Sequence, residues 1–188
     1  KKTTAIGNVA KATGENATAI GAWTNAAKYN TTAIGSEAQA IADYAQAMGY
    51  QSKASGIASN AIGRNANASG ILSMALGADS VAQGIDSAAI GRDAKALGNE
   101  SIALGARAKA LEKNSTALGS QSTAKKEMDL AVGYEAIASG GQSTAVGFQS
   151  QSTGLDSTAI GSQSLAAGEY STAVGHGARA EKTSDLAA

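Results

Sequence analysis

The chain has 188 residues, including 23 glycines, no proline, no cysteine and only 4% aromatic residues, so its interior has to be built from small side chains. Its formal net charge is zero and charged residues make up 16%, which excludes the basic surface typical of nucleic-acid binding or of a polybasic membrane contact. The lack of cysteine excludes a disulfide scaffold, and no run of about 18 apolar residues is present that would span a bilayer.

A glycine recurs at every fourteenth position of the sequence. It is the last residue of similar six-residue segments such as NATAIG at 16–21, NTTAIG at 30–35 and DSTAIG at 156–161. Thirteen copies in phase indicate a solenoid, in which one short unit stacks on the next and the chain is elongated. The thirteen glycines are Gly7, Gly21, Gly35, Gly49, Gly63, Gly77, Gly91, Gly105, Gly119, Gly133, Gly147, Gly161 and Gly175.

Short strands fit this period better than helices do. Helix-pair repeats need about 33–47 residues, and a glycine in every repeat would cost a helix about 1 kcal/mol relative to alanine. We therefore expect two short strands and two turns in each repeat.

Successive side chains of a strand point to opposite faces of the sheet, so the position of a residue in the repeat predicts the face on which it lies. Alanine stands two residues before the glycine in every copy, and small residues stand three and five residues after it. These small faces are predicted to meet in a thin interior, with turns stacked about 4.8 Å apart. A second glycine, such as Gly14 or Gly56, often follows seven residues after the first and is expected to give the other turn a positive φ.

An aliphatic residue precedes the glycine in every copy, and its side chain points away from the small-residue interior. Threonine often shares this outer face, as at Thr4, Thr18 and Thr32. Soluble monomers rarely expose so long an apolar stripe, so other copies of the chain are predicted to cover it, although the columns alone do not fix their number. The predicted inter-chain core is Ile6, Ile20, Ile34, Met48, Ile62, Leu76, Ile90, Leu104, Leu118, Val132, Val146, Ile160 and Val174.

The thirteen in-phase copies resemble the head domain of YadA-like trimeric autotransporter adhesins, with their Hep/Hag-type head repeats, over essentially the whole chain. The resemblance implies a left-handed parallel β-roll solenoid of about thirteen 14-residue repeats, intertwined as a homotrimer on the cell surface of a Gram-negative bacterium. It assigns residues 1–181 to the head and 182–188 to a run-out toward a neck. A stalk and a C-terminal outer-membrane anchor are expected outside this sequence.

The resemblance further implies a non-enzymatic virulence adhesin. Its partners would be host extracellular-matrix proteins such as collagen, fibronectin or laminin, or a host receptor ectodomain, and some such heads also mediate self-aggregation. A passive spacer within a longer surface fibre is the main alternative. An ice-binding array along the threonine column is a weaker one, because that column is broken and shares its face with the aliphatic residues.

The residue types present also argue against catalysis, without reference to the family resemblance. The single histidine, His176, has no reason to meet a particular serine, and the glycines recur with the repeat instead of clustering before a helix as in a phosphate-binding loop. Asp79 and Asp93 stand one repeat apart, but two carboxylates are too few to define a metal site. No cofactor is predicted.

Aromatic residues are the candidate ligand-binding positions, because stiff aromatic anchors are enriched among interface hot spots. Four of them fall close together in the sequence near the N-terminus, and Trp23 is the first choice. The column directly after the glycine holds three, with His176 in the same column. The candidates are Trp23, Tyr29, Tyr44, Tyr50, Tyr134 and Phe148.

Two stretches depart from the pattern of the repeat. Asp129 and Leu130 take positions usually held by serine and threonine, and Ala45 and Gln46 do the same earlier in the chain. Drift within a long array is the simpler interpretation of both, with an unusual surface site as the alternative.

Overall fold

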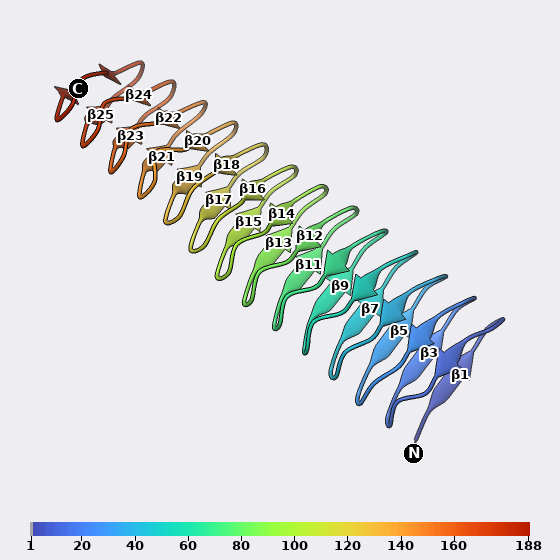
Figure 1. Cartoon of the computed structure of the whole chain (residues 1–188). Coiled ribbons are helices and arrows are strands. Elements are labelled where there is room, and N and C mark those ends of the chain that lie inside the picture. The colour runs from blue at the N-terminus through green and yellow to red at the C-terminus, as the bar shows by residue number, and fades with distance from the viewer. Residues whose placement is uncertain (1) are drawn as a thin grey trace. The chain divides into compact units, whose positions relative to one another are not determined.

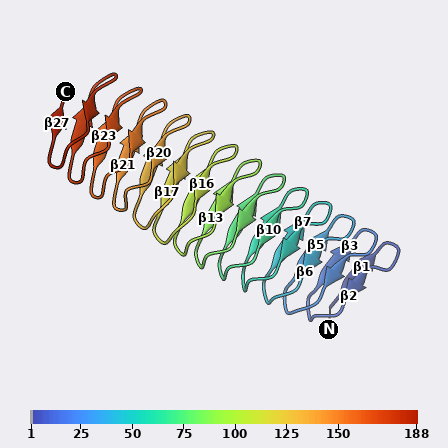
Figure 2. The same ribbon diagram turned by 45° about the horizontal axis from the view of Figure 1, so that its top comes forward.

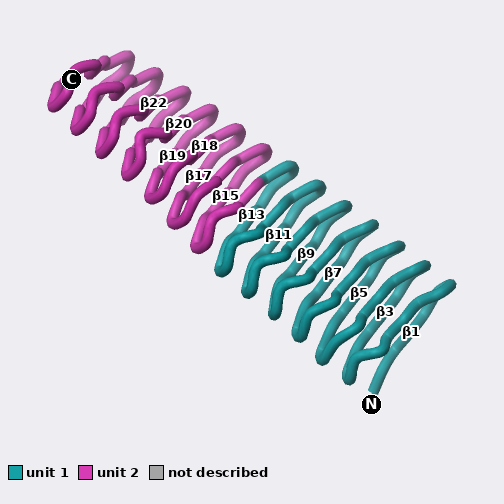
Figure 3. The backbone as a smooth tube through the Cα atoms, viewed as in Figure 1, with its two compact units in different colours: residues 1–94 teal, residues 95–188 magenta. Residues whose placement is uncertain are grey.

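A computed structural model of the protein describes residues 2–188, and these residues form strands and turns without a helix. The chain divides into two compact units, residues 1–94 and residues 95–188 (Figure 3). Both are built from one 14-residue rung, which holds a three-residue strand, a first turn, a two-residue strand and a second turn (Figure 1). The prediction of an all-β parallel solenoid of about thirteen repeats is confirmed.

In unit 1 the three-residue strands form one parallel sheet, the long-strand sheet, and the two-residue strands form the short-strand sheet. Each strand pairs with the strand one rung on without a shift in register, so Ala5 lies beside Ala19 and Ile6 beside Ile20. The long strands are β1 (Thr4–Ile6), β3 (Thr18–Ile20), β5 (Thr32–Ile34), β7 (Gln46–Met48), β9 (Asn60–Ile62), β11 (Met74–Leu76) and β13 (Ala88–Ile90). The short strands are β2 (Lys11–Ala12), β4 (Asn25–Ala26), β6 (Gln39–Ala40), β8 (Lys53–Ala54), β10 (Asn67–Ala68) and β12 (Val81–Ala82).

Unit 2 repeats the arrangement, and the stacked rungs are seen from a second angle in Figure 2. The long strands are β15 (Ile102–Leu104), β17 (Thr116–Leu118), β19 (Leu130–Val132), β21 (Thr144–Val146), β23 (Thr158–Ile160), β25 (Thr172–Val174) and β27 (Leu186–Ala187). The short strands are β14 (Lys95–Ala96), β16 (Lys109–Ala110), β18 (Thr123–Ala124), β20 (Ile137–Ala138), β22 (Gln151–Ser152), β24 (Leu165–Ala166) and β26 (Arg179–Ala180).

The last residues of the chain add one more strand to unit 2. In β27, Leu186 and Ala187 pair with Thr172 and Ala173 of β25. The expectation that 182–188 leads on toward a neck stays a prediction.

The interior of each rung consists of small side chains, as the alternation predicts. Apart from the terminal rungs, where Ala5 is exposed, the alanine column of the long strands, such as Ala19 and Ala75 in unit 1, is fully buried, and so is the alanine column of the short strands, such as Ala40 and Ala110. Because the two sheets meet through methyl-sized groups, the rung is thin and has no room for a larger side chain. The apolar residues of the long strands must therefore point outward.

Buried serine and threonine hydroxyls close the two turns of the rung. In the first turn, Ser52 Oγ donates to the carbonyl of Gly49 at 3.0 Å and Ser122 Oγ to that of Gly119 at 2.8 Å. In the second turn, Ser87 Oγ donates to the carbonyl of Gly84 at 2.7 Å. These bonds satisfy hydroxyls that burial would otherwise leave without partners, which explains why polar residues occupy interior columns.

The repeat glycine is required by both its backbone conformation and its surroundings. Gly35 has a φ of +118°, and a Cβ added to it would lie 2.8 Å from the carbonyl carbon of Gly49 on the next rung. Its N–H also donates to the carbonyl of Ile20 at 2.8 Å, which ties it to the preceding rung. Every side chain other than hydrogen is therefore excluded at this column.

The predicted positive φ of the second glycine is wrong. Gly14 and Gly56 lie outside the left-handed region, and the positive φ of the second turn falls two residues later, at Asn16 and Ala58. Glycine is favoured at the earlier position for a different reason, because a Cβ on Gly14 would overlap the carbonyl of Lys28. The close stacking of rungs, and not the turn conformation, selects glycine there.

Candidate functional site

The outer face of the long-strand sheet carries the predicted aliphatic column, which we call the aliphatic stripe. Within unit 1, Ile6, Ile34 and Ile62 are exposed, with 37% of Ile34 accessible to solvent, and within unit 2 Leu104, Ile160 and Val174 are exposed. Threonine side chains such as Thr18 and Thr32 share this face. In each unit, the long-strand sheet therefore presents apolar and methyl-bearing groups to its surroundings.

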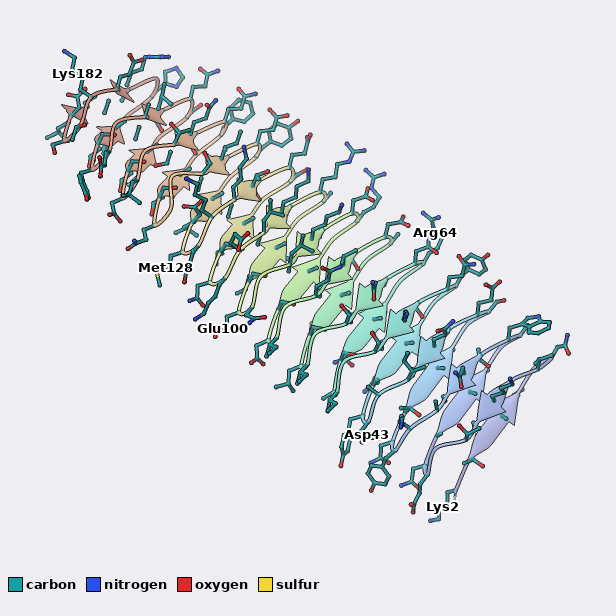
Figure 4. The ribbon with its side chains drawn as sticks, in the orientation of Figure 1. Lys2, Asp43, Arg64, Glu100, Met128 and Lys182 are labelled. Carbon is teal, nitrogen blue, oxygen red and sulfur yellow. The ribbon has the colours of Figure 1, made fainter. Side chains whose placement is uncertain are left out.

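The aromatic candidates occupy both edges of the rung. Trp23 and Tyr50 belong to first turns, whereas Tyr29 and Tyr44 belong to second turns. Figure 4 shows the two edges of unit 1, with Arg64 projecting from the first-turn edge and Asp43, the neighbour of Tyr44, from the opposite one. The four N-terminal aromatic residues, which lie close together in the sequence, are thus divided between two surfaces.

Two aromatic pairs form across neighbouring rungs. The ring centroids of Tyr29 and Tyr44 are 5.4 Å apart with an interplanar angle of 84°, an edge-to-face pair. Asp43 supports this pair because its Oδ1 accepts a bond from the backbone N–H of Tyr29 at 3.1 Å. Tyr134 and Phe148 stack with centroids 5.5 Å apart and planes 11° from parallel.

Trp23 stands out among the candidates because 59% of its surface is exposed. Its backbone is held in the left-handed region at a φ of 60°, and its N–H donates to the carbonyl of Asn8 at 2.9 Å. The position of the indole is therefore set by a backbone that is bonded to the neighbouring rung. This combination of a fixed base and an exposed ring suits a contact residue.

Tyr170 is an exposed aromatic residue that the sequence analysis did not include. It is 54% exposed and occupies the second-turn column of unit 2 that corresponds to Tyr44 in unit 1. The neighbouring Glu169 carboxylate raises the pKa of the Tyr170 phenol. Its column relation to Tyr44 is the sequence signal by which it could have been found.

Asp129 is a structural residue and not a surface site. Only 1% of it is exposed. Its Oδ2 accepts from the backbone N–H of Lys126 at 2.8 Å, which closes the second turn through the N–H, whereas serines such as Ser87 donate to the carbonyl at this turn. Its Oδ1 accepts from the N–H groups of Gly141 and Ser143, both at 3.0 Å, and from Ser143 Oγ at 2.7 Å. The carboxylate thus joins two successive rungs of unit 2.

Replacing Asp129 with alanine is expected to lower the free energy of unfolding by about 2–3 kcal/mol, because several buried donors would lose a charged acceptor. Thermal and urea denaturation followed by circular dichroism would measure the change. Ser115→Ala is the matched control, since Ser115 holds the same position one rung earlier and its hydroxyl donates to the carbonyl of Glu112 within its own rung. That change is expected to cost about 1 kcal/mol, and equal losses in the two variants would contradict the inter-rung role of Asp129.

The carboxylate of Asp79 in unit 1 is paired with neighbouring side chains. Asp79 Oδ2 lies 2.7 Å from Arg64 Nη2, and Asp79 Oδ1 accepts from Asn65 Nδ2 at 2.8 Å. Across residues 2–188 there is no group of three or more His, Cys, Asp or Glu side chains placed to hold a metal ion. None of the described segments is a helix long and apolar enough to cross a membrane.

The fold and its surfaces define a class of repeat proteins, namely parallel β-solenoids with an alanine and serine interior and one aliphatic outer face. The family described as the YadA head domain repeat (2 copies) matches nearly all of this chain, and the chain belongs to that family. The matched residues are 1–22, 26–52, 40–66, 54–80, 68–94, 82–108, 96–122, 110–127, 124–150 and 152–178.

Among solved structures, the chain is similar to the crystal structure of the collagen-binding domain of the Yersinia adhesin YadA. The two are 24% identical, the match covers 85% of this chain and 71% of that chain, and the TM-score is 0.48. A comparison with curated proteins finds no significant match.

Proposed function

We propose that this chain is the head of a bacterial surface adhesin that attaches the cell to a host extracellular-matrix protein such as collagen, fibronectin or laminin, or to a host receptor ectodomain. The observation that carries the proposal is family membership, since the YadA head repeat extends over most of the chain. The proposed role is non-enzymatic and places the head at the cell surface, with anchoring in the outer membrane by another region of the protein. Self-aggregation of cells is a further proposed role.

The active form is proposed to be a homotrimer of left-handed rolls. The aliphatic stripe supports association, because it leaves exposed apolar side chains along the long-strand sheet of each unit. A trimer would carry three copies of each binding site. Once one site has bound, binding at a second is intramolecular, so the overall affinity rises without any new kind of contact.

Trp23 is proposed as the first contact residue for the host protein. Replacing it with alanine is expected to weaken binding to the preferred immobilised matrix protein or receptor ectodomain by about 30-fold, a typical loss for a hot-spot tryptophan. Surface plasmon resonance against a panel of these proteins would measure the effect, after light scattering has established the assembly state.

Tyr170→Ala is the matched control for Trp23→Ala, because Tyr170 is similarly exposed but lies in a second turn of unit 2. It is expected to bind like the unchanged protein. Equal losses in both variants would remove Trp23 from the proposed site.

A trimer that binds no panel member would favour the second candidate, a passive spacer. The uniformity of the rungs, which share one interior and one pair of turns, is the observation that supports this alternative. Ice binding lacks comparable support, because the threonine side chains share their face with exposed isoleucines such as Ile34.

A further inference from the structure

A groove of about 530 Å³ runs along the first-turn edge of unit 2. Four of its lining residues occupy the same column, two residues after the repeat glycine, in four successive rungs. Two more come from the neighbouring short strands β20 and β22. The lining residues are Gln121, Glu135, Gln149, Gln163, Ile137 and Gln151.

The backbone fixes the spacing of the column residues. The N–H of Gln149 donates to the carbonyl of Tyr134, and that of Gln163 to the carbonyl of Phe148, both at 2.8 Å. Each bond joins one rung to the one before it, so successive side chains of the column are presented about 4.8 Å apart. The groove is therefore built on the ladder of the fold and does not depend on a loose loop.

Hydrogen bonds between side chains fix part of the groove and still leave donors and acceptors that a ligand could use. Gln149 Nε2 donates to Glu135 Oε2 at 2.8 Å, and Gln121 Nε2 donates to the hydroxyl of Tyr134 at 3.0 Å. A glutamine amide has two N–H donors and an oxygen with two lone pairs, and a carboxylate accepts several bonds. The row can therefore bind a ligand that both donates and accepts hydrogen bonds.

An aromatic pair borders this polar row. Tyr134 and Phe148 directly precede Glu135 and Gln149 in sequence, and their rings are stacked 5.5 Å apart and exposed. Together with Ile137 on the short-strand side, they give the polar row apolar neighbours. Ligand sites typically combine apolar contact area with a few placed polar groups in this way.

The corresponding column of unit 1 lacks this continuity. Gln51 Nε2 donates to Glu37 Oε2 at 2.8 Å, the same bond as that between Gln149 and Glu135. In that column, however, the pair is followed by Asn65 and preceded by Trp23. The amide–carboxylate bond is thus a recurring feature of the turn, whereas three glutamines and one glutamate in four successive rungs of this column occur in unit 2 and not in unit 1.

We infer that the groove formed by Gln121, Glu135, Gln149 and Gln163, beside the Tyr134–Phe148 pair, is a binding site for a neutral oligosaccharide. Sugar hydroxyls both donate and accept, as the amide row requires, and the C–H face of a sugar ring packs against an aromatic face. The charged group of the lining is the Glu135 carboxylate, which disfavours sulphated or sialylated chains beside it through like-charge repulsion, and Arg107 stands in the same column one rung before Gln121, outside the lining. This site goes beyond attachment to a host protein through Trp23 and does not depend on it.

The test uses the full chain in its native assembly, with a printed array of neutral oligosaccharides followed by calorimetric titration of the strongest array binder. Heparin tetrasaccharide is titrated in parallel as the negatively charged comparison ligand. Gln149→Ala and Phe148→Ala are each expected to weaken neutral-glycan binding about tenfold or more, since each removes one polar or stacking contact. Gln51→Ala is the matched control because it breaks the equivalent bond to Glu37, and it is expected to leave glycan binding unchanged.

Failure of every neutral oligosaccharide to bind would overturn the inference, and so would tighter binding of heparin. Unchanged affinity in both Gln149→Ala and Phe148→Ala would overturn it as well. Melting temperatures of Gln149→Ala and Gln51→Ala, measured together, separate loss of the site from loss of the fold. Binding of matrix proteins by the same preparations reports on the adhesin proposal separately.

Discussion

The Ile34→Asp variant is expected to remain folded as a single chain but to lose its assembly. The Ile34 side chain is 37% exposed in one chain and lies in the aliphatic stripe of unit 1. Full burial of such a side chain contributes about 1.5–3 kcal/mol, so covering the exposed third of Ile34 in the proposed trimer adds roughly 0.5–1 kcal/mol in each copy. Aspartate removes that contribution and brings three carboxylates toward one another in a dry contact, where charge burial without a partner is costly. Light scattering would report the mass of one chain, where the mass of three is expected for the unchanged protein.

Gln39→Asp is the control for this change because it introduces the same residue in the same rung. Gln39 lies in β6, on the exposed outer face of the short-strand sheet. We expect this variant to keep the assembly and the melting temperature of the unchanged protein. If both variants assemble equally, the aliphatic stripe is not the inter-chain contact, whereas if both dissociate, the faces have been assigned wrongly.

The Gly63→Ala variant is expected to lose about 3–5 kcal/mol of stability per chain, combining left-handed strain with overpacking. Gly63 has a φ of +135°, and a Cβ there would lie 2.6 Å from the carbonyl carbon of Gly77. Neither glycine can move aside easily, because their N–H groups bond to Met48 and Ile62 of preceding rungs, both at 2.8 Å. Denaturation at a fixed protein concentration, followed by circular dichroism, would measure the loss.

Gly177→Ala separates the two contributions. Gly177 also has a positive φ, of +68°, but a Cβ added to it meets nothing within 4 Å. Its replacement is expected to cost only the strain of a left-handed residue, about 1–2 kcal/mol. Similar losses at Gly63 and Gly177 would contradict the contribution expected from the close approach of the next rung at Gly63.

The fold could be predicted from the sequence because each column of the repeat has one environment. The columns of Ala19, Ile20 and Gly21 hold alanine, an aliphatic residue and glycine in all thirteen copies, so alternation and period together define the interior, the outer face and the turn. A single copy would have been too short to distinguish a strand from a loop. Thirteen copies make the distinction possible, because a column that holds the same kind of residue in every copy must have the same environment in every rung.

The conformation of the turns was harder to predict, because residues with side chains adopt it. Asn16, Asn30 and Asp156 take a positive φ in the second turn, and Asn and Asp are the residues that tolerate it best. The same column also accepts Tyr44 and Leu72, which obscures that preference. Hydrogen bonds to the neighbouring rung hold these residues in place, and sequence propensity does not include such bonds.

The candidate surfaces were predictable as columns but not as clusters. Tyr134 and Phe148 share a column, and the structure stacks them. Tyr29 and Tyr44 come from adjacent columns and nevertheless meet edge to face, because both side chains extend from the same edge. The interior carboxylate of Asp129 could not be distinguished from drift, because its partners on Gly141 and Ser143 belong to the next rung.

The in-register pairing of identical rungs also determines how such a gene can change in length. Gain or loss of one whole repeat by unequal recombination leaves every later residue in its own column and shifts it by about 4.8 Å. An insertion of a single codon within a strand turns the residues that follow it in that strand to the opposite face, because strand side chains alternate. Variation among natural relatives is therefore expected in steps of whole repeats, which lets the reach of the head be adjusted while its faces are preserved.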